Sequence, residues 1–599
     1  MISRKQWEKL DDFRAVDLAL ADFVQQRLGA GEPLGLAAAL ASRALGEGHT
    51  FVDLARWHAA QPDLAGTLPL ADWLALLQDS EAVAPSAGDA PLVLEDGRLY
   101  LARQWQAEES VAYRLRQLLQ QPASELPPES AGWLRELFPQ ASAGPDWQMA
   151  ACTLAAHRRL AIITGGPGTG KTTTVIRLLA LLQRIARPSS LRIRLAAPTG
   201  KAAARLSESI SGKLLELPMG FSGGVPSEVV TLHRLLGSGV RGKRFAHHAD
   251  NPLHADVVVV DEASMIDLEM MQALLDALPQ HARLILLGDK DQLASVEAGS
   301  VLGELCRDAG VPAYDADTLE VLGRLTGQEF SASAGAGDRL AQHIVMLRHS
   351  HRFGADSQIG RMAAAINQGD ADTLADLCRQ EDETVQLSAY PALMPALVEG
   401  LADYLRRVAA PVPADGADQH AIATLQALAQ FQVLCAVRSG PHGVVALNAQ
   451  IVSALQRQQL LPLASQSHSE WFAGRPVMMT RNDYTLEVMN GDVGVTLMTP
   501  RGLRVVFNVG GSMRWVLPGR IESAETAFAM TIHKSQGSEF DTACIVLPED
   551  ADSPVLTREL LYTAVTRAKK RVLLLAPPAV LQQSVQRRVE RASALRDKL

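Results

Sequence analysis

The spacing of apolar and polar positions predicts a helical region at the start of the chain. Up to about residue 80, "LAAALASRAL" is rich in helix formers, and apolar side chains recur at helical spacing at Phe13, Val16, Leu20, Phe23 and Val24. "PLVLEDGRLYL" (91–101) predicts two short strands joined at Asp96-Gly97. The Pro-, Ser- and Glu-rich stretch 120–132 predicts a linker. We therefore expect a mainly helical N-terminal domain over residues 1–120.

Continuous apolar strands follow in two groups. Between 133 and 350 they are "RLAIITG", "RIRLAAP", "DVVVVDE" and "RLILLGD", and after 431 they are "FQVLCAV", "DTACIVLP" and "RVLLLAP". Strands that are apolar throughout are typical of parallel sheets covered by helices on both faces. We expect an α/β fold with two such domains, 133–350 and 351–599. A Gly-punctuated, β-rich stretch at 475–520 predicts a small barrel inserted in the second sheet.

Composition agrees with a multidomain globular protein. The chain has 599 residues, 47% hydrophobic and 21% charged, which suggests about three to five domains. Its five cysteines lie far apart, without zinc-site spacing, so we expect a reduced, cytoplasmic protein with no structural metal. The first residues lack a signal-peptide core and no apolar run is long enough to span a bilayer, so no membrane is expected.

The charge distribution argues against a protein coated in basic surface. The net charge is −9, which is unfavourable for bulk nucleic-acid binding. A local basic groove stays possible, because residues 557–599 carry ten Lys or Arg against three acids.

"GGPGTGKT" (165–172) follows one apolar strand and precedes a helical run, which is the context of a phosphate-binding loop. Gly165, Gly168 and Gly170 let backbone N–H groups face a common concavity, and the helix N-terminus adds its dipole. Lys171 is expected to reach the β- and γ-phosphates, and the Thr172 hydroxyl to bind Mg²⁺. A glycine-rich turn with a chance lysine is the alternative.

"VVVVDEAS" (257–264) is a strand that ends in two carboxylates. Asp261 is expected to hold the Mg²⁺ shell, while Glu262 orients and deprotonates the attacking water. An acidic strand end alone is common, but a phosphate loop about ninety residues earlier makes the pair a strong indication of nucleotide hydrolysis.

Two further stretches suggest nucleotide contacts. In "LLGDKDQL" (286–293) the strand end carries Asp289 and Gln292, and Gln292 is expected to sense the γ-phosphate unless the stretch is only a capped turn. In "PDWQMAA" (145–151), Gln148 lies close enough to the phosphate loop to read an adenine edge; by itself it would be an ordinary surface residue.

Eight motifs occur in order and resemble those of superfamily 1 DNA helicases, specifically the RecD branch, the α subunit of exodeoxyribonuclease V. They are "GGPGTGKT", "APTGKAAARL" (197–206), "TLHRLLG" (231–237), "VVVVDEAS", "GDKDQL", "HSHRF" (349–353), "TIHKSQGSEFD" (531–541) and "LYTAVTRAKK" (561–570). The resemblance covers most of 133–577. It implies two RecA-like motor domains and hydrolysis of ATP with Mg²⁺.

The resemblance also implies roles for single residues. Gln148 is expected to contact adenine, the phosphate loop with Thr173 to hold the nucleotide, and Glu539 to reach the ribose. Arg352 and Arg567 match the two arginines that family members direct at the γ-phosphate from the second motor domain. Without the family, Arg567 would read as a basic surface residue, although the helix around it is otherwise apolar.

The polar segment "TIHKSQGSEFD" is matched to the loop that touches both DNA and nucleotide. DNA contacts are expected at His533, Lys534, Ser535 and Gln536 in this segment and at Thr199 and His233 in the first motor domain. A packing histidine is an equal alternative for His233. Residues 242–253 are expected to form either a short strand-separating hairpin or an irregular basic loop. The sequence departs from the family at Ala294, where a proline is usual.

The resemblance implies an ATP-dependent DNA helicase that moves 5′ to 3′ on DNA. The resemblance implies a heterotrimer with RecB-like and RecC-like subunits that processes double-strand DNA ends, the N-terminal region being the dock. One alternative is a free-standing RecD-like helicase, which usually has a longer N-terminal extension than the roughly 130 residues here. Others are a non-translocating ATP-dependent switch and a subunit with a dead ATP site. No acid cluster with the spacing of a metal-dependent nuclease is found.

Overall fold

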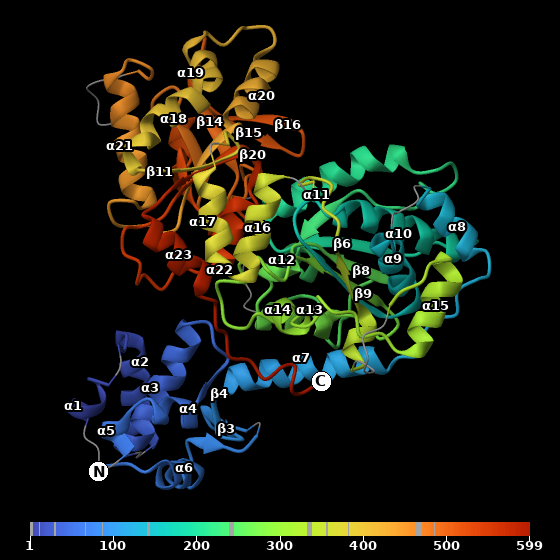
Figure 1. Ribbon diagram of the computed structural model, residues 1–599, viewed down its shortest axis with the longest axis vertical. Coiled ribbons are helices and arrows are strands. Elements are labelled where there is room, and N and C mark those ends of the chain that lie inside the picture. Colours follow the sequence, from blue (N-terminus) through green and yellow to red (C-terminus); the bar gives the residue numbers. More distant parts are fainter. Residues whose placement is uncertain are drawn as a thin grey trace.

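The computed structural model describes the chain except residues 1–3, 11, 29–30, 66, 87, 140–143, 239–244, 332–337, 355–356, 381, 463–469 and 484. The N-terminal part forms a lobe of its own, and two sheet-containing parts form the rest of the molecule (Figure 1). Within the described ranges, no helix is both long and apolar enough to cross a membrane.

The N-terminal lobe is mainly helical, as expected, around a small four-stranded sheet of order β1-β4-β3-β2. The predicted hairpin is confirmed: β3 and β4 pair antiparallel, and Asp96 (φ 51°) and Gly97 (φ 76°) form the left-handed turn between them. Strands β1 and β2 were not predicted because each has at most three residues. The elements are α1 (Arg4–Trp7), α2 (Ala15–Leu28), α3 (Glu32–Gly46), β1 (Phe51–Asp53), α4 (Leu54–Ala59), α5 (Pro62–Ala65), α6 (Leu70–Gln78), β2 (Val83–Ala84), β3 (Leu92–Glu95) and β4 (Arg98–Leu101).

The first α/β domain is built on a six-stranded parallel sheet of order β10-β5-β9-β8-β6-β7. All four predicted strands are confirmed, and they form the four central positions of the sheet. The edge strands β7 and β10 were missed because they are only three and four residues long. The strands are β5 (Leu160–Gly165), β6 (Ile193–Ala197), β7 (Val229–Thr231), β8 (Val257–Val260), β9 (Arg283–Gly288) and β10 (Ile344–Leu347).

Helices cover both faces of this sheet, as the apolar strands required. They are α8 (Ser130–Leu137), α9 (Trp147–His157), α10 (Lys171–Ile185), α11 (Gly200–Lys213), α12 (Leu232–Leu236), α13 (Leu268–Ala277), α14 (Val301–Leu305) and α15 (Ala316–Thr326), with the 3₁₀ turns η1 (Leu214–Glu216), η2 (Ala263–Met265) and η3 (Leu340–His343).

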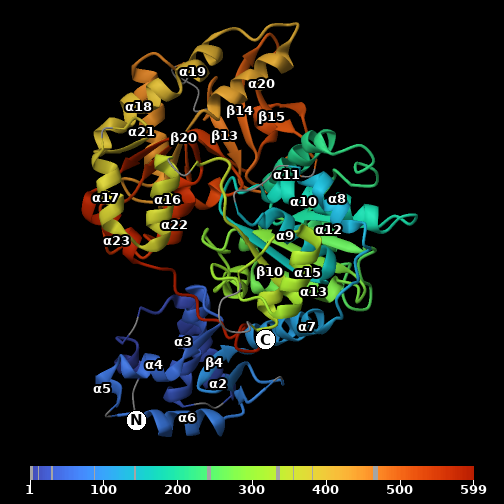
Figure 2. The ribbon, with the colours of Figure 1, turned by 45° about the vertical axis from the view of Figure 1, so that its right-hand side comes forward.

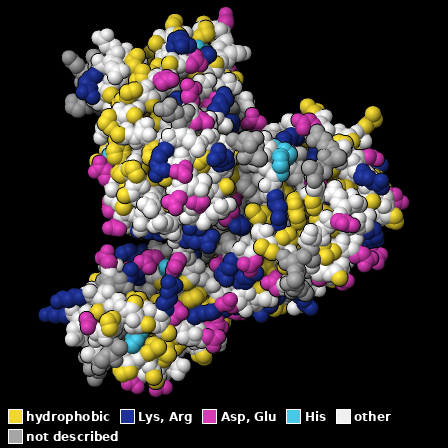
Figure 3. Space-filling model, viewed as in Figure 1, with side chains coloured by type: hydrophobic (Ala, Val, Ile, Leu, Met, Phe, Trp, Pro, Cys, Tyr) yellow, Lys and Arg dark blue, Asp and Glu magenta, His cyan; other side chains and the backbone are white. Residues whose placement is uncertain are grey.

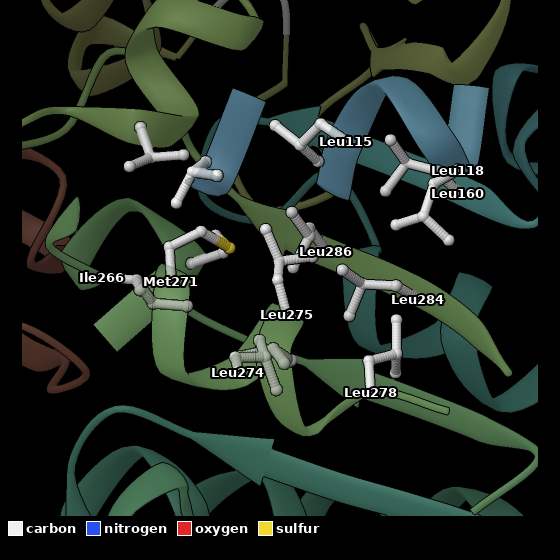
Figure 4. Packing of buried hydrophobic residues seen from close by; sticks show 14 of the residues in the cluster. Leu115, Leu118, Leu160, Ile266, Met271, Leu274, Leu275, Leu278, Leu284 and Leu286 are labelled. Carbon is white, nitrogen blue, oxygen red and sulfur yellow. The ribbon is translucent and has the colours of Figure 1, made fainter. Parts of the chain in front are cut away.

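Helix α7 (Ala102–Gln120) links the N-terminal lobe to this domain and belongs to its core. Leu115 and Leu118 of α7 pack beside Leu274 and Leu275 of α13, and beside Leu278 just after that helix, in one buried cluster (Figure 4). The expected N-terminal domain of residues 1–120 thus contains a helix whose apolar face is covered by the first α/β domain. Sequence periodicity shows that α7 is amphipathic but cannot say which core it covers.

The second α/β domain has a five-stranded parallel sheet of order β11-β20-β19-β12-β18. The three predicted strands form its centre. The elements are α16 (Gln358–Gln368), α17 (Ala371–Arg379), β11 (Val385–Ser388), η4 (Tyr390–Ala392), α18 (Leu393–Gly400), α19 (Ala402–Ala409), α20 (Ala417–Leu428), β12 (Phe431–Cys435), α21 (Val444–Arg457), β18 (Ala529–Thr531), η6 (His533–Ser535), β19 (Phe540–Val546), α22 (Arg558–Val565), β20 (Ala568–Leu575) and α23 (Pro578–Gln586).

The β-rich insertion interrupts this domain between β12 and β18. It is a five-stranded antiparallel sheet of order β16-β15-β14-β13-β17. Within the described part of the chain, no pairing between β16 and β17 closes it into the expected barrel. Its elements are β13 (Pro476–Met479), β14 (Val493–Thr499), β15 (Gly502–Val509), β16 (Ser512–Val516), η5 (Pro518–Arg520) and β17 (Ala524–Thr526).

The C-terminal segment, residues 587–599, returns from the second α/β domain and ends beside α7 (Figures 1 and 2). Leu595 is buried in the core that α7 shares with the first α/β domain. Lys598 pairs with Glu95 at 2.8 Å and Glu109 at 2.9 Å, and Arg596 pairs with Asp308 at 2.6 Å. Part of the basic excess of 557–599 therefore holds the protein together. Elsewhere, basic and acidic side chains are interspersed over the face in Figure 3.

Candidate functional site

A cleft of about 950 Å³ lies between the two α/β domains. It is lined by all but one of the residues predicted to bind or hydrolyse nucleotide, and the exception, Gly165, is buried at the end of β5. The predicted residues in the lining are Gln148, Gly168, Gly170, Lys171, Thr172, Thr173, Asp261, Glu262, Gln292, Arg352, Glu539 and Arg567. The fold thus brings together groups that are separated by up to 419 positions in the chain (148 to 567).

The phosphate loop connects β5 to α10, which begins at Lys171. Gly168 and Gly170 have φ of 77° and 83°, where a side chain would be strained. At Gly168 a Cβ would also come within 2.3 Å of the Cβ of Arg352. The amine of Lys171 donates to the carbonyls of Gly165 at 2.6 Å and Gly166 at 3.1 Å. The loop therefore presents one cation and a helix N-terminus to the cleft, an arrangement that binds phosphate.

Two carboxylates follow β8. Glu262 has φ of 52°, a left-handed conformation that costs a non-glycine residue about 1–3 kcal/mol and that recurs at functional sites as well as in turns such as that at Asp96. Burial, and then the adjacent Glu262, raises the pKa of Asp261 to about 6. Two neighbouring, half-buried carboxylates favour a cation beside them. Within the described ranges, no group of three or more His, Cys, Asp or Glu is arranged to hold a metal. Mg²⁺ is usually bound by one or two carboxylates together with substrate phosphates and water.

Two arginines reach the cleft from chain segments that follow the first sheet. Arg352 pairs with Glu539 at 2.5 Å, and burial lowers its pKa to about 10. Its neighbour His351 donates its backbone N–H to Gly168 O at 2.8 Å, which holds this segment against the phosphate loop. Arg567 is 3% exposed and donates to the carbonyls of Thr563 at 3.1 Å and Ser538 at 3.2 Å. Both guanidiniums are thus preorganised at the cleft.

Arg205 is a third arginine of the cleft, and sequence reasoning missed it. It lies on α11 of the first α/β domain, forms an ion pair with Glu539, and donates to Gly537 O at 3.3 Å. The available signal was its place in "APTGKAAARL", a segment already matched to the family. The carboxylate of Glu539, expected at the ribose, is consequently held by two guanidiniums. A nucleotide that uses Glu539 has to compete with Arg205 and Arg352 for it.

Gln148 lies at the edge of the cleft beside the phosphate loop. Asp146 caps the start of α9, accepting the N–H groups of Gln148 at 2.9 Å and Met149 at 3.0 Å. The side-chain amide of Gln148 donates to Thr169 O at 3.0 Å. This cap and this hydrogen bond orient the amide next to the loop, where an adenine contact is feasible.

The predicted DNA-contacting residues lie outside the lining of this cleft. In the first α/β domain, the Thr199 hydroxyl caps α11 by accepting the N–H of Ala202 at 3.2 Å. His233 is exposed on α12, with its ring 5.9 Å from that of Phe245. The expected hairpin at 242–253 begins outside the described residues; its described part contains a bridge between His248 and Asn251.

In the segment 533–536, protein contacts use most of the polar groups. Ser535 is fully buried and donates to Ile532 O at 2.7 Å, while Lys534 pairs with Glu525 at 3.3 Å. Burial lowers the pKa of His533. Gln536 crosses to the first α/β domain and donates to Leu293 O at 2.9 Å. DNA contacts by these residues stay a prediction, and the contact made by Gln536 joins the two domains.

Three protein-family models match parts of the chain. "RecBCD enzyme subunit RecD, N-terminal domain" matches residues 9–100, "AAA domain" matches 148–298, and "UvrD-like helicase C-terminal domain" matches 526–575. The matched segments correspond to the N-terminal lobe, most of the first sheet, and the last three strands of the second sheet.

Curated relatives match along most of the chain. The RecBCD enzyme subunit RecD of Mycobacterium tuberculosis is 41% identical over 577 residues, covering 95% of this chain and 91% of that protein. The same subunit of Haemophilus influenzae is 36% identical, covering 88% and 85%. The ATP-dependent RecD2 DNA helicase of Deinococcus radiodurans is 29% identical, covering 88% and 62%.

Solved structures also match. A Pif1 helicase from Bacteroides, in complex with ADP-AlF₃ and single-stranded DNA, is 17% identical with a TM-score of 0.37, covering 72% of this chain and 92% of that one. The identities to the curated subunits, together with the cleft between the two α/β domains, lead to one conclusion. The chain belongs to the RecD family of superfamily 1 DNA helicases.

Proposed function

We propose that this ATP-dependent DNA helicase is the motor subunit of an exonuclease V complex and moves 5′ to 3′ on DNA. The observation that carries the proposal is that one cleft collects a phosphate loop and two carboxylates from the first α/β domain and two arginines from the segments beyond it. Hydrolysis at such a cleft changes how the two domains close. A strand gripped by both domains would then be moved at each cycle.

The residues divide the work of hydrolysis between them. Lys171 neutralises the phosphates, Glu262 orients and deprotonates the attacking water, and Arg352 and Arg567 stabilise charge in the transition state. Thr172 and Asp261 would supply oxygen ligands of the kind that Mg²⁺ prefers, and the bound ion would offset the negative charges of Asp261 and of the phosphates. Gln292 senses the γ-phosphate and Gln148 selects adenine.

Two observations favour a protein that works as a subunit of a complex over one that works as a free-standing helicase. The N-terminal lobe matches the RecD model by itself, and identity is 41% to a RecBCD subunit against 29% to the RecD2 helicase. The complex would contain RecB-like and RecC-like subunits, act on double-strand DNA ends, and work in the cytoplasm.

The test of the function compares ATP hydrolysis by the isolated chain with and without single-stranded DNA. We expect DNA to stimulate turnover, and the chain to displace a strand from a duplex with a 5′ tail but not from one with a 3′ tail. Stimulation without displacement would instead indicate a non-translocating switch. A rate of ATP hydrolysis that is the same with and without single-stranded DNA would contradict the proposal.

Replacing Gln536 with Ala should uncouple hydrolysis from DNA. Its amide joins the second α/β domain to Leu293, next to Gln292, while supplying neither a nucleophile nor a metal ligand. The loss of one interdomain hydrogen bond costs about 1.4 kcal/mol, which corresponds to roughly a tenfold change in rate. We expect basal hydrolysis to persist and DNA stimulation and unwinding to fall about tenfold, measured by steady-state ATPase and strand displacement.

Gln432 to Ala is the matched control, because Gln432 is equally buried and donates to Phe528 O at 2.9 Å within one domain. It should leave DNA stimulation unchanged. If basal hydrolysis collapsed in the Gln536 variant, this residue would belong to the catalytic site itself.

The docking surface that we propose is the exposed apolar side of α2. Val16 is 58% exposed and Phe23 52% exposed, and both lie at helical spacing with the half-buried Leu20. We expect Val16→Ser together with Phe23→Ser to weaken co-purification with the other subunits about tenfold or more, while DNA-stimulated ATP hydrolysis by the isolated chain persists.

Substitution is preferable to deletion of residues 1–115, which would remove much of α7 from the core of the first α/β domain. Leu76→Ser is the matched control, because Leu76 is 53% exposed on another helix of the same lobe. Normal assembly of the α2 variant would place the dock on the α/β domains.

A further inference from the structure

The loop that carries Gln292 belongs to the first α/β domain but is anchored in the second. Its Leu293 N–H donates to the Thr563 hydroxyl at 2.9 Å, and its Leu293 carbonyl accepts from Gln536 at 2.9 Å. The Leu293 side chain is buried in the apolar core of the second domain. The position of this loop therefore depends on how the two domains meet.

A buried carboxylate lies at the start of the same loop and receives donors from both domains. Asp289 is 1% exposed, and its Oδ2 accepts the side-chain amide of Gln292 at 2.9 Å. The same oxygen accepts the hydroxyl of Tyr562, on α22 of the second domain, at 3.1 Å. Its other oxygen accepts the backbone N–H of Asp291 at 3.1 Å. Tyr562, Asp289 and Gln292 thus form one buried chain of hydrogen bonds across the domain interface.

We propose that Tyr562 is a positioning residue for ATP hydrolysis, whose hydroxyl orients the Gln292 amide through Asp289 when the two domains are closed. The inference rests on the proposed role of Gln292 as the γ-phosphate sensor. It adds a residue from the second domain that acts on the sensor without touching the nucleotide.

The surroundings of the Tyr562 hydroxyl explain how it can orient the Gln292 amide through Asp289. The ring of Tyr562 is packed in the core of the second domain, and its hydroxyl reaches across to Asp289. On the other side of the interface, a Cβ on Gly166 of the phosphate loop would lie 3.0 Å from this hydroxyl. Any side chain at Gly166 would crowd it. The hydroxyl therefore meets both the phosphate loop and Asp289, and separation of the domains breaks both contacts.

The protonation states of Tyr562 and Asp289 allow the hydroxyl to orient the carboxylate. Burial raises the pKa of the Tyr562 hydroxyl well above its ordinary value, so it stays a donor at neutral pH. Burial also raises the pKa of Asp289, while Lys171 favours its charged form. In either protonation state Asp289 can accept the tyrosine hydroxyl. Without that donor, one buried contact that orients the carboxylate is lost.

The experiment compares Tyr562→Phe with Tyr404→Phe in the full chain. Tyr404 is also fully buried in the second domain and donates to Gly474 O at 2.9 Å, away from the cleft. Each variant keeps the ring and loses one hydroxyl. We expect Tyr562→Phe to lower kcat for DNA-stimulated ATP hydrolysis about tenfold, with KM and ADP affinity within about twofold. Tyr404→Phe should leave kcat unchanged.

A double-variant cycle then tests whether Tyr562 acts through Gln292. In a Gln292→Ala background, Tyr562→Phe should have no further effect on kcat. Losses that add would overturn the inference, as would a Tyr562→Phe enzyme with normal kcat or one that loses ADP affinity in parallel. If Gln292→Ala alone left kcat unchanged, the sensor role of Gln292 would fall, and this inference with it. A wild-type chain without DNA-stimulated turnover would instead contradict the proposed function.

Discussion

Lys171→Gln should lower kcat for ATP hydrolysis about 10³-fold, the size of loss that follows removal of one preorganised charge-stabilising donor. Lys171 supplies the cation of the phosphate loop, and a glutamine offers an amide without the charge. In the described part of the chain, the amine donates to the carbonyls of Gly165 and Gly166, and its charge also favours the charged forms of Asp261 and Asp289. Steady-state ATPase measurements with saturating single-stranded DNA check this, alongside a thermal unfolding curve that should stay close to the wild type.

Lys290→Gln controls for the loss of a half-buried lysine in the same domain, since Lys290 pairs with Asp291 at 2.6 Å outside the cleft lining. We expect near-normal turnover for it. Near-normal turnover for Lys171→Gln would mean that the phosphates bind elsewhere.

Arg567→Ala should lower kcat about 10³-fold, at the lower end of arginine effects in nucleotide hydrolases, while changing nucleotide affinity much less. The guanidinium is fixed by Thr563 O and Ser538 O, and Glu262 and Asp289 attract it across the cleft. Its charge is therefore placed where the transition state develops negative charge. Separate determination of kcat and of ADP affinity distinguishes this role from ground-state binding.

Arg567→Lys should restore only part of kcat, because lysine keeps the charge but cannot make both carbonyl contacts in the same geometry. Arg475→Ala is the control for removing a buried arginine: Arg475 is 5% exposed and bonds Thr526 and Glu470 O in the insertion. Equal losses of kcat and ADP affinity in Arg567→Ala would indicate that this arginine holds the ground state.

Short-range information in the residue order was sufficient to predict the central strands, the Asp96-Gly97 hairpin, and the phosphate loop and carboxylates of the nucleotide cleft. Arg352, Glu539 and Arg567 were expected at the cleft through the family resemblance, and Arg205 was missed. Apolar runs such as those in "RLAIITG" and "RLILLGD" favour strands buried on both faces, and a glycine loop between such a strand and a helix has few other uses. Edge strands such as β7 and β10 escaped because three or four residues carry too little pattern.

The tertiary structure decided which groups meet. The sequence contains no sign that Gln536 bonds Leu293, that Tyr562 bonds Asp289, or that Arg205 pairs with Glu539, since the partners lie 243, 273 and over 300 positions apart. It also left α7 assigned to the N-terminal domain, because an amphipathic helix shows that it has an apolar face and not which core covers it. Local pattern specifies which side chains each segment contains. The packing of the two α/β domains against each other decides which of these side chains meet, as Arg205 and Arg352 do at Glu539 and Gln292 and Tyr562 do at Asp289.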